Sequence, residues 1–573
     1  MARFVFPFLV LCASVLTTSD AAGSEALDLG GDTDRSGFID DSALEEQLEA
    51  TQSVIVLNNC DDDDEDSAAD NLDNVINGPE DEKDFEEVVL RQVEALPGGP
   101  VSLQLRPRSA DGTDPLQRVR VTNGEGDEIL GPSTSDTYSL TAAELQELTE
   151  GEMLFFVEGL TFATSSELVV RLNDQDQDSL ILEVAPFLLL PHNRDAKENY
   201  VVELTHSDDK LDSQSYVLAF EDAVSMANVE PVPLKVFSEE GDVWIEDEMS
   251  WGYTETPRVQ MPVVLHMPRG GELSDLHDAV KDLMKPGIGY FRAFDYPEEW
   301  SELDFGGNLE VTPPVAGHRF GRIYYGSLKS TNNAYRNYYR RKINSGFQEF
   351  FERQGQQASV DLSTDWLWVG HIDEVVTFIP KAGGGFRMLL ASPELAVATL
   401  REMGESETLD SRYDDYYGAP TVGDLLAKNY YGVSSAEFNG YVDARIFGPV
   451  HSNPSPSSIK GTMMRELGLE ESDIEEVPVL FENHPGAEAA TPKKKFAAVA
   501  LTPGMVNLSS MGKHVLAPNP FIPEFQDLFE DALTGTGASV AWIDNWWLYH
   551  RGNGEVHCGS NEKREFFKAH WWE

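Results

Sequence analysis

Short strand-like segments dominate the chain from Leu27 to about Leu190, and they constrain its fold more than any other feature. Apolar residues alternate or run together in SVIVLNN (53–59), VSLQLRP (101–107), MLFFVEGL (153–160), ELVVRLN (167–173) and SLILEVAPFLLL (179–190). Residues that favour turns, mainly Asn, Asp and Gly, separate these segments. Several short strands divided by turns are typical of a β-sandwich, so we expect one over residues 24–190.

The sequence changes character after PHNRDAKEN (191–199). Strand-like runs such as RIYYG (322–326) and FRMLLAS (386–392) now alternate with helix-like stretches such as LSDLHDAVKDLMKP (273–286) and FQEFFERQGQQ (347–357). This mixture predicts an α/β domain over residues 191–573. No repeat of fixed length is visible, so the arrangement of its sheets does not follow from periodicity.

The N-terminus has the pattern of a secretory signal peptide. Arg3 precedes an apolar run from Phe4 to Leu16, and Ser19 and Ala21 follow with the spacing of a cleavage site. A short membrane anchor is the weaker alternative, because spanning a bilayer takes roughly 20 apolar residues. No other segment is apolar and long enough to span. We therefore predict a signal peptide over residues 1–21 and a secreted, extracellular protein without a membrane partner.

The chain is strongly acidic. It contains 100 Asp and Glu against 42 Lys and Arg among 573 residues, a formal charge of −58. Nucleic acid is excluded as an expected partner, because binding a polyanion requires a basic surface. Calcium, cationic peptides and simple solubility all remain compatible with such acidity.

An incomplete calcium loop occurs near the N-terminus, in GDTDRSGFIDDSALEEQ (31–47). The positions that match an EF-hand loop are Asp32, Asp34, Ser36, Gly37 and Asp40. Position twelve of the loop is Ala43, where an EF-hand requires a bidentate Glu. A regular EF-hand is therefore not expected. A calcium ion held by Asp32 and Asp34 together with Asn59, Asp61 or Asp63 is one prediction, and a solvated acidic loop is the alternative.

Two further stretches place charged residues among apolar ones. In WIEDEMSWGY (244–253), an extended chain turns Glu246 and Glu248 to one face and Asp247 to the other. One face then suits a cation and the other a substrate, although an ordinary acidic edge strand fits equally well. In WLWVGHIDEVVTFIP (366–380), a strand places His371 and Asp373 on one face. Such groups are costly in an apolar strand unless they are paired or used, so a structural His–Asp pair also stays open.

NGEVHCGSN (553–561) contains one of only three cysteines. Removal of the signal peptide eliminates Cys12, which leaves Cys60 and Cys558 and at most one disulfide. Zinc binding by Cys558 is not indicated, because no C-x-x-C or H-E-x-x-H spacing accompanies it. His557 points to the opposite face of a strand, so a base from elsewhere, such as His371, suits this thiol better. A buried structural cysteine remains the alternative to a nucleophile.

Taken together and in order, these stretches resemble the catalytic domain of peptidylarginine deiminases. The resemblance is carried by WIEDEMSWGY, FGGNLEVTPP (305–314), WLWVGHIDEVVTFIP and NGEVHCGSN, and it extends from about Leu27 to the C-terminus. GEMLFFVEGLTF (151–162) resembles the family's immunoglobulin-like middle domain, whereas its usual first sandwich domain has no counterpart. The resemblance implies a C-terminal α/β-propeller of pseudo-fivefold symmetry, preceded by an immunoglobulin-like β-sandwich.

The resemblance also implies roles for individual residues. Cys558 matches the nucleophile and His371 the general acid and base. Asp247 and Asp373 match the carboxylates that bind the guanidinium nitrogens of arginine, a planar cation suited to bidentate carboxylates. Among substrate-binding residues, Trp244 matches one that lines the arginine channel and Arg269 one that holds the peptide backbone. The chemistry requires no organic cofactor.

Calcium is the point at which the sequence departs from the family. One family calcium uses positions matching Glu246, Ser250, Gly306, Leu309 and Glu310. A second uses positions matching Glu248, His266, Met267 and Gly270. Ca²⁺ prefers oxygen ligands, so His266 and Met267 predict that the second position is lost. We expect any calcium to be mainly structural, with weak or no dependence of the active site on it.

The leading prediction is a secreted protein-arginine deiminase that converts peptidyl-arginine and water to peptidyl-citrulline and ammonia. Arginine-containing peptides or proteins are then the partners, and the oligomeric state stays open. One rival is a deiminase of free arginine or another small guanidino compound. The other is a catalytically silent, calcium-binding secreted protein.

Overall fold

A computed structural model describes most of the chain. The described residues are 26–39, 52–63, 68–72, 83–108, 114–206, 209–227, 232–239, 241–269, 274–293, 301–327, 342–430, 432–486 and 496–573. The predicted signal peptide lies outside them. The chain divides into two compact units, which we describe separately. The N-terminal unit comprises residues 1–54, 86–157 and 165–182, and the C-terminal unit comprises 55–85, 158–164 and 183–573.

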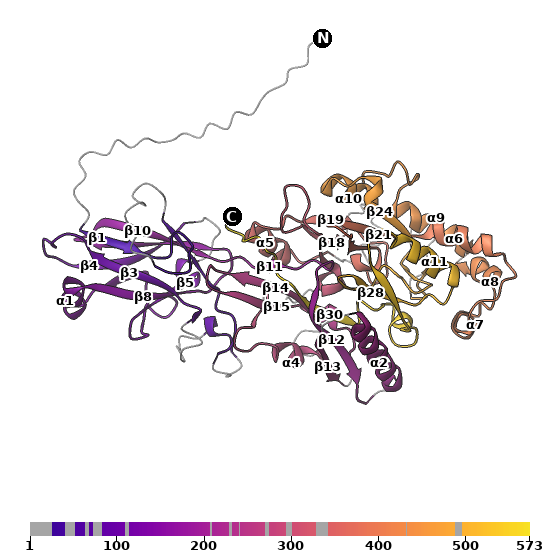
Figure 1. Cartoon of the computed structure of the whole chain (residues 1–573), viewed down its shortest axis with the longest axis horizontal. Coiled ribbons are helices and arrows are strands. Elements are labelled where there is room, and N and C mark those ends of the chain that lie inside the picture. The colour runs from indigo at the N-terminus through magenta and orange to yellow at the C-terminus, as the bar shows by residue number, and fades with distance from the viewer. Residues whose placement is uncertain are drawn as a thin grey trace, which may run out of the picture. The chain divides into compact units, whose positions relative to one another are not determined.

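Two five-stranded sheets form from the strand-like segments of the first third (Figure 1). The first has the order β1 (Leu27–Gly30), β3 (Glu86–Gln92), β8 (Glu152–Gly159), β5 (Val119–Asn123), β6 (Glu128–Leu130). The second has the order β2 (Ser53–Val56), β10 (Gln175–Val184), β9 (Ser165–Leu172), β4 (Val101–Pro107), β7 (Thr137–Ser139). Alternation along β4 buries Val101, Leu103 and Leu105 on one face, as the period of two predicts. The one α-helix here among the described residues, α1 (Ala142–Glu150), begins with a capping box at Thr141.

Five sheets of the C-terminal unit repeat one pattern, in which an antiparallel pair is extended by a parallel strand. In sequence order of their central strands they are β30 (Ser560–Arg564), β12 (Ala196–Leu204), β13 (Leu234–Glu239); β14 (Met249–Glu255), β15 (Gln260–His266), β16 (Gly289–Phe291); β17 (Leu309–Val311), β18 (Ile323–Ser327), β19 (Val360–Ser363); β20 (Val376–Pro380), β21 (Phe386–Ser392), β24 (Ile474–Pro478); and β27 (Ser509–Met511), β28 (His514–Pro518), β29 (Ser539–Ile543). β11 (Leu188–Leu189) extends the second of these at β14. Two short pairs, β22 (Asn429–Tyr430) with β23 (Val433–Ser434) and β25 (Phe481–Asn483) with β26 (Ala498–Ala500), complete the sheets.

A helical crossover joins the two parallel strands of each of these five sheets, as parallel pairing requires. The connecting helices are α2 (Lys210–Ala227), α4 (His277–Lys281), α5 (Ser345–Gln354), the group α6 (Pro393–Met403), α7 (Ser411–Tyr417), α8 (Val422–Ala427), α9 (Ser435–Ile446) and α10 (Ile459–Leu467), and α11 (Pro523–Ala532). Figure 1 shows α2 against β12, helices α6–α9 at one end of the unit and α10 near β19. Tyr216 and Phe220 of α2 are buried with Tyr200 and Val202 of β12. None of the described helices is long and apolar enough to cross a membrane.

Three segments that we expected to be strands contain turns instead. Residues 245–248 form one helical turn, α3 (Ile245–Glu248), so Glu246 and Glu248 do not share a face. The stretch from residue 366 becomes extended only at β20, and His371 caps a short 3₁₀ helix, η7 (Ile372–Glu374). Residues 556–559 form a turn that leads into β30. Each of these segments carries buried polar groups, and a turn lets neighbouring side chains reach partners in different directions.

Candidate active site

Cys558 lies in the turn before β30 and is 5% exposed. Its Sγ is 3.3 Å from Nδ2 of Asn507, and its backbone N–H donates to Oδ1 of the same side chain over 3.3 Å. Both cysteines of the described residues, Cys60 and Cys558, are free thiols. Burial raises the pKa of the Cys558 thiol well above its usual value, and the negative charges of Asp373 and Asp247 raise it further. Ionising this thiol therefore requires a nearby positive charge.

Asp373 connects the thiol to a histidine. Its Oδ2 lies 3.5 Å from Sγ of Cys558 and accepts a hydrogen bond from Nδ1 of His557 over 2.9 Å. Its Oδ1 is buried and has no hydrogen-bond partner in the structure. Burial opposes protonation of His557, but Glu246, Asp373 and Glu310 outweigh it and raise its pKa to about 10. His557 thus donates to Asp373, and among the described residues it makes no hydrogen bond to the thiol of Cys558.

Asp247, on α3, is the second buried carboxylate of the site. Nη1 of Arg269 donates to its Oδ2 over 3.2 Å, and Nη2 of Arg269 lies 2.9 Å from Oδ2 of Asp242. The other oxygen, Oδ1, has no hydrogen-bond partner in the structure. Burial raises the pKa of Asp247, while the nearby His371 and Arg269 oppose that rise. Asp247 and Asp373 therefore each keep one buried oxygen available for a donor.

His371 presents one ring nitrogen to these carboxylates. Its Nε2 lies 2.7 Å from the carbonyl oxygen of Glu302, so this nitrogen carries the proton that the carbonyl accepts. The other nitrogen, Nδ1, then bears the lone pair in the neutral ring, and it lies 3.5 Å from Oδ1 of Asp247. The ring is 1% exposed. This tautomer suits a group that takes up and returns a proton at Nδ1.

Gly307 keeps the space between these groups open. A Cβ atom at this position would lie 2.8 Å from Nδ1 of His371, 3.0 Å from Oδ2 of Asp373 and 3.2 Å from Oδ1 of Asp247. Gly307 belongs to the 3₁₀ helix η6 (Gly306–Asn308), which packs against η7 and α3. The side chains of His371, Asp373 and Asp247 therefore converge on Gly307.

Trp244 precedes α3 and packs edge-on against Tyr549, with ring centroids 5.3 Å apart. Two glycines allow its ring to approach the loop that carries Cys558. A Cβ at Gly552 would lie 2.8 Å from the Trp244 ring, and one at Gly554 would lie 2.3 Å from it and 3.2 Å from Cβ of Cys558. Trp244 therefore lies close to the loop that carries Cys558, and its role as a channel residue stays a prediction.

All six predicted catalytic and substrate-binding residues thus gather in one region of the C-terminal unit. The sequence model of the protein-arginine deiminase (PAD) family matches residues 174–447 and 449–573, which include all of them. The chain belongs to the protein-arginine deiminase family. It is 31% identical over 452 residues to protein-arginine deiminase type-4 of Mus musculus, with 73% of this chain and 62% of the relative aligned. It is 30% identical over 565 residues to type-3 of the same species, with 91% and 77% aligned.

The chain spans less than two thirds of the length of the type-4 relatives from Mus musculus and Rattus norvegicus, 62% in each case. Among solved structures, an agmatine deiminase of C. jejuni is 11% identical, with a TM-score of 0.37 and 67% of this chain and 98% of the other covered. An agmatine deiminase of Enterococcus faecalis is also 11% identical, with a TM-score of 0.34 and 66% and 96% covered.

The first calcium position of the family does not fit calcium in this protein. Glu246 and Glu310 are present and buried, but two imidazoles accompany them. Nδ1 of His192 lies 2.9 Å from Oε2 of Glu310, and Nε2 of His557 lies 3.8 Å from Oε1 of Glu246. His192, Glu246 and Glu310 border a cavity of about 30 Å³, which Leu309 also lines. Calcium requires six to eight oxygen ligands, and two nitrogen donors occupy much of the space that they need.

The second position is closed by hydrogen bonds between protein groups. Oε1 of Glu248 lies 3.0 Å from Nε2 of His266, and Oε2 accepts from Ser274 over 2.9 Å. Sδ of Met267 is 4.0 Å from the hydroxyl of Ser250. Burial raises the pKa of Glu248 to about 8 and lowers that of His266 to about 3. A neutral acid beside a neutral imidazole thus occupies the second position, and its loss as a calcium site stays a prediction.

The N-terminal loop behaves as an Asx-type turn. Backbone N–H groups of Ser36 and Gly37 donate to the two oxygens of Asp32 over 2.8 and 2.9 Å, and Ser36 N–H is also 3.0 Å from Oδ1 of Asp34. Asp40 and Ala43 lie outside the described residues. Asp32 and Asp34 belong to one unit and Asn59, Asp61 and Asp63 to the other, so a calcium ion shared between them stays a prediction.

Three residues of the site were not predicted from the sequence. Asn507 lies in Asn-Leu-Ser, which the sequence offers only as an acceptor for N-glycosylation, yet it is 2% exposed and contacts Cys558. His192 lies in a loop-like stretch outside the matching motifs, and a glycine such as Gly307 has no side chain to suggest a role. His557 was set aside because a strand would turn it away from Cys558. In the turn that forms instead, it reaches the same carboxylate, Asp373, as the thiol.

Proposed function

We propose that this chain hydrolyses the guanidinium group of arginine residues in peptides or proteins, producing citrulline residues and ammonia. The observation that carries the proposal is the pair of buried carboxylates, Asp247 and Asp373, each with an unpartnered oxygen, beside a buried thiol. A guanidinium is a planar cation with five N–H donors, and it satisfies both oxygens at once. Bound in that way, its central carbon lies next to Cys558, so the reacting atoms are held close together.

The same geometry supports a reaction sequence. The bound cation offsets the carboxylate charges that keep the Cys558 thiol protonated, so when substrate arrives the thiol gives its proton to Nδ1 of His371 and becomes a thiolate. Sγ then bonds to the guanidinium carbon, and the carbon–nitrogen bond to the departing nitrogen breaks with a proton supplied through His371, which releases ammonia. Water gives its proton back to Nδ1 of His371 and attacks the same carbon. The carbon–sulfur bond breaks, and citrulline leaves with the thiol restored.

Peptide-borne arginine is the favoured substrate class. The relatives with at least 30% identity are named protein-arginine deiminases, and Arg269, which matches a residue that holds the peptide backbone, lies partly exposed beside Asp247. Deimination of free arginine or another small guanidino compound remains the first alternative. A silent calcium-binding protein is less well supported, because it has no use for two buried carboxylates with unpartnered oxygens.

The remaining parts of the proposal concern architecture and location. We propose that the five repeated sheets of the C-terminal unit form a pseudo-fivefold propeller over residues 191–573. An immunoglobulin-like sandwich over residues 24–190 and a signal peptide over residues 1–21 that directs secretion complete this proposal. The site is proposed to work with little or no calcium, since its two family calcium positions hold imidazoles.

A citrulline assay separates these functions. Purified protein is incubated with an arginine-containing protein, with benzoylated arginine and with free arginine, and citrulline is measured. We expect product from the first two, with Cys558→Ala inactive. Turnover of free arginine alone would favour the small-molecule alternative. Absence of citrulline from every substrate would reject both enzymatic functions.

A further inference from the structure

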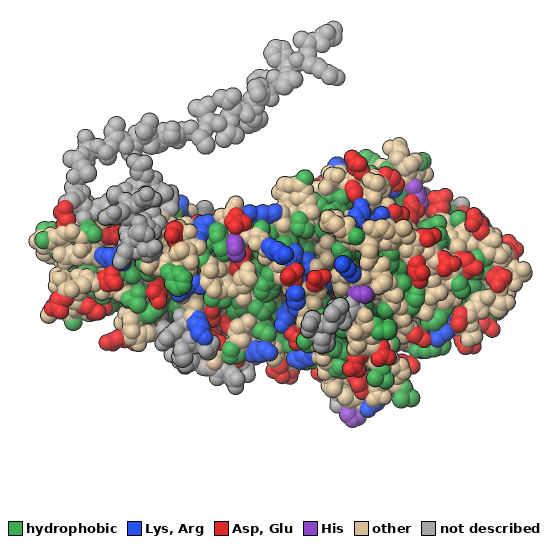
Figure 2. Space-filling model, in the orientation of Figure 1, with side chains coloured by type: hydrophobic (Ala, Val, Ile, Leu, Met, Phe, Trp, Pro, Cys, Tyr) green, Lys and Arg blue, Asp and Glu red, His purple; other side chains and the backbone are tan. Residues whose placement is uncertain are grey.

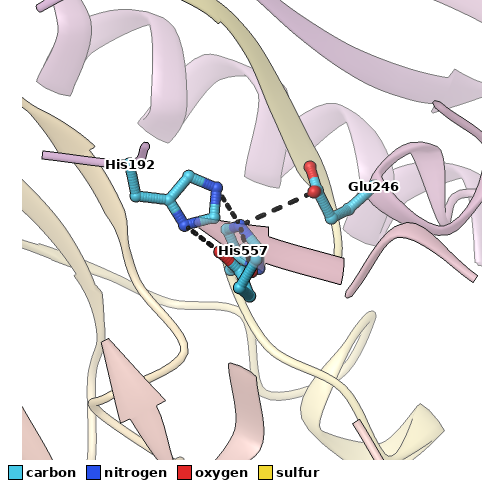
Figure 3. A group of neighbouring side chains, drawn as sticks. His192, Glu246 and His557 are labelled. Carbon is cyan, nitrogen blue, oxygen red and sulfur yellow. Dashed lines mark hydrogen bonds and ion pairs between the residues drawn. The ribbon is translucent and has the colours of Figure 1, made fainter. Parts of the chain in front are cut away.

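Two histidines and two glutamates meet next to the candidate active site, joined to it by the hydrogen bond from His557 to Asp373. They are His192, Glu246, Glu310 and His557, and their nitrogen and oxygen atoms lie within 4.8 Å of one another. Figure 3 shows the ring of His557 between His192 and Glu246. All but His192 are at least 96% buried, and the side chain of His192 is 16% exposed. The group therefore has one side through which a small solute can enter.

The hydrogen bonds fix which ring nitrogens carry protons. Nδ1 of His557 donates to Asp373, and Nδ1 of His192 lies 2.9 Å from Oε2 of Glu310, a carboxylate oxygen that accepts a proton. In neutral rings the lone pairs then reside on the two Nε2 atoms. These atoms lie only 2.9 Å apart. Two lone pairs at that distance repel each other, so a cation has to lie between them.

Glu246 and Glu310 likewise each have one oxygen that faces Nε2 of His557 without a hydrogen bond. Oε2 of Glu246 accepts from Nδ2 of Asn561 over 2.6 Å, which leaves Oε1 facing Nε2 of His557 at 3.8 Å. Oε1 of Glu310 is buried without a hydrogen-bond partner and lies 3.7 Å from the same nitrogen. With metal–ligand bonds of about 2.0–2.1 Å, neighbouring ligands of a tetrahedral zinc ion are about 3.3 Å apart. Separations of 2.9, 3.7 and 3.8 Å bracket that value.

We propose that these four side chains form a binding site for a divalent transition-metal ion of the zinc class. The ligands are Nε2 of His192, Nε2 of His557, Oε1 of Glu246 and Oε1 of Glu310. Imidazole nitrogens suit zinc and its neighbours, whereas calcium requires oxygen. Three of the proposed ligands also contact a neighbouring group: His557 contacts Asp373, Glu246 contacts Asn561, and His192 contacts Glu310. A carboxylate that accepts from the second ring nitrogen, as Asp373 does from His557, is the usual arrangement for a metal-bound histidine.

Charge favours a metal ion over a proton as the cation. Glu246, Glu310 and Asp373 surround the two imidazoles, while the neighbouring Arg564 is already paired with Glu562 over 2.8 Å. One shared proton neutralises one of these three buried carboxylates, and a divalent ion neutralises two. Buried charges are costly unless compensated. The carboxylate that remains is Asp373, which the proposed function assigns to the guanidinium; the metal site itself does not depend on that function.

The test measures metal binding directly. The full chain is stripped of metal, dialysed against Zn²⁺, Co²⁺ or Ca²⁺, and analysed for bound metal by mass spectrometry. We expect one equivalent of Zn²⁺ that the His192→Gln variant loses, with affinity lowered at least about a hundredfold, since even outer partners are worth 10- to 100-fold. Co²⁺ should give the intense visible absorption of a four-coordinate ion, a readout that needs no substitution and no enzymatic assay.

Two matched variants locate the ion. His451→Gln alters another histidine–carboxylate group, Glu394, Asp443 and His451, and Cys558→Ser removes the nearby thiol. Both should keep the zinc equivalent, and Ca²⁺ binding elsewhere should be unchanged by His192→Gln. The proposal is overturned if the unmodified chain binds no Zn²⁺, if His192→Gln binds as well as the unmodified chain, or if either matched variant loses the ion. A six-coordinate Co²⁺ spectrum would also overturn it.

Discussion

Arg269 places a guanidinium nitrogen 3.2 Å from Oδ2 of Asp247, while the other oxygen of that carboxylate lies 3.5 Å from Nδ1 of His371. The chain's own arginine thus holds one oxygen of a carboxylate whose second oxygen is proposed to receive the arginine of the substrate. Arg269 also contacts the backbone oxygen of Trp244 at 3.2 Å. One side chain therefore fixes both a binding carboxylate and a wall of the site.

Replacement of Arg269 tests this arrangement. We expect Arg269→Ala to lower kcat/KM by at least about tenfold, chiefly through KM, because Asp247 loses its orienting ion pair. Arg269→Lys should recover only part of the loss, since a single ammonium cannot make the same forked contacts. Steady-state citrulline formation measures both, and substitution of the exposed Arg401 serves as control. A faster Arg269→Ala enzyme would show that the ion pair restrains substrate binding.

Gly307→Ala should abolish most activity without unfolding the protein. The added methyl group would lie within 3.2 Å of Nδ1 of His371, Oδ2 of Asp373 and Oδ1 of Asp247, and it would occupy the space proposed for the guanidinium. Displacement of about 1 Å at a reacting centre costs on the order of a hundredfold in rate. Gly440→Ala on α9, which meets nothing within 4 Å, is the control. Equal activity of the two variants would place the guanidinium elsewhere.

Asn507 should carry no glycan in active protein, although Asn-Leu-Ser is an acceptor sequence. The side chain is 2% exposed and its amide contacts Sγ of Cys558, so a sugar cannot be accommodated in the folded state. Peptide mapping of protein secreted by a glycosylating host checks this. An active enzyme with an occupied Asn507 would contradict the position of this side chain beside the thiol.

Glu248 should give the stability of the protein a pH dependence that Glu248→Gln removes. Its pKa is about 8 in the folded state and near 4.3 when unfolded. The folded state therefore binds the proton more tightly, and this stabilisation is complete below about pH 4 and is lost as pH rises towards 8. Relative to the parent protein, Glu248→Gln should gain stability between pH 5.5 and 8, by a few kcal/mol at most. Urea unfolding at several pH values measures this, and a constant difference would indicate that Glu248 is already ionised.

Calcium should not be a specific requirement for activity. The two family calcium positions contain His192 and His557 in one case and His266 in the other, and nitrogen donors disfavour Ca²⁺. After treatment with a chelator and its removal, added Ca²⁺ should change citrulline formation less than about twofold. Such a change is smaller than the roughly 10- to 100-fold effect of losing even one outer partner of a metal ligand. Recovery of activity with Ca²⁺ alone, and not with Zn²⁺, would contradict this.

The residues proposed to carry the chemistry could be selected from the sequence because they lie in recognisable motifs. Asp247, His371, Asp373 and Cys558 are far apart in the chain, yet each sits in a stretch that resembles one family. Their local conformations were not predictable in the same way. An apolar run containing His371 and Asp373 fits a strand pattern, but buried polar side chains need partners in several directions, and η7 supplies them.

His192, Asn507 and Gly307 could not be predicted from the sequence for a different reason. His192 becomes significant only through its 2.9 Å approach to His557, a contact between residues separated by most of the C-terminal unit. Asn507 and Gly307 act through their closeness to other side chains, and no spacing along the chain encodes that closeness. The acidic side chains that dominate the composition are spread over the visible surface near α6, α8 and α9 (Figure 2). These surface side chains account for the net negative charge, but they do not indicate where the candidate active site lies.

The pairing of β30 with β12 has a consequence for biosynthesis. β30 is the last described strand to leave the ribosome, and it completes a sheet whose other two strands, β12 and β13, were made hundreds of residues earlier. Cys558 immediately precedes it. Since chains generally fold from the N-terminus as they emerge, the Cys558 thiol can join Asp247 and Asp373 only after the other described strands of the C-terminal unit have been synthesised. A chain that ends before residue 558 would therefore lack the proposed nucleophile and is expected to be inert.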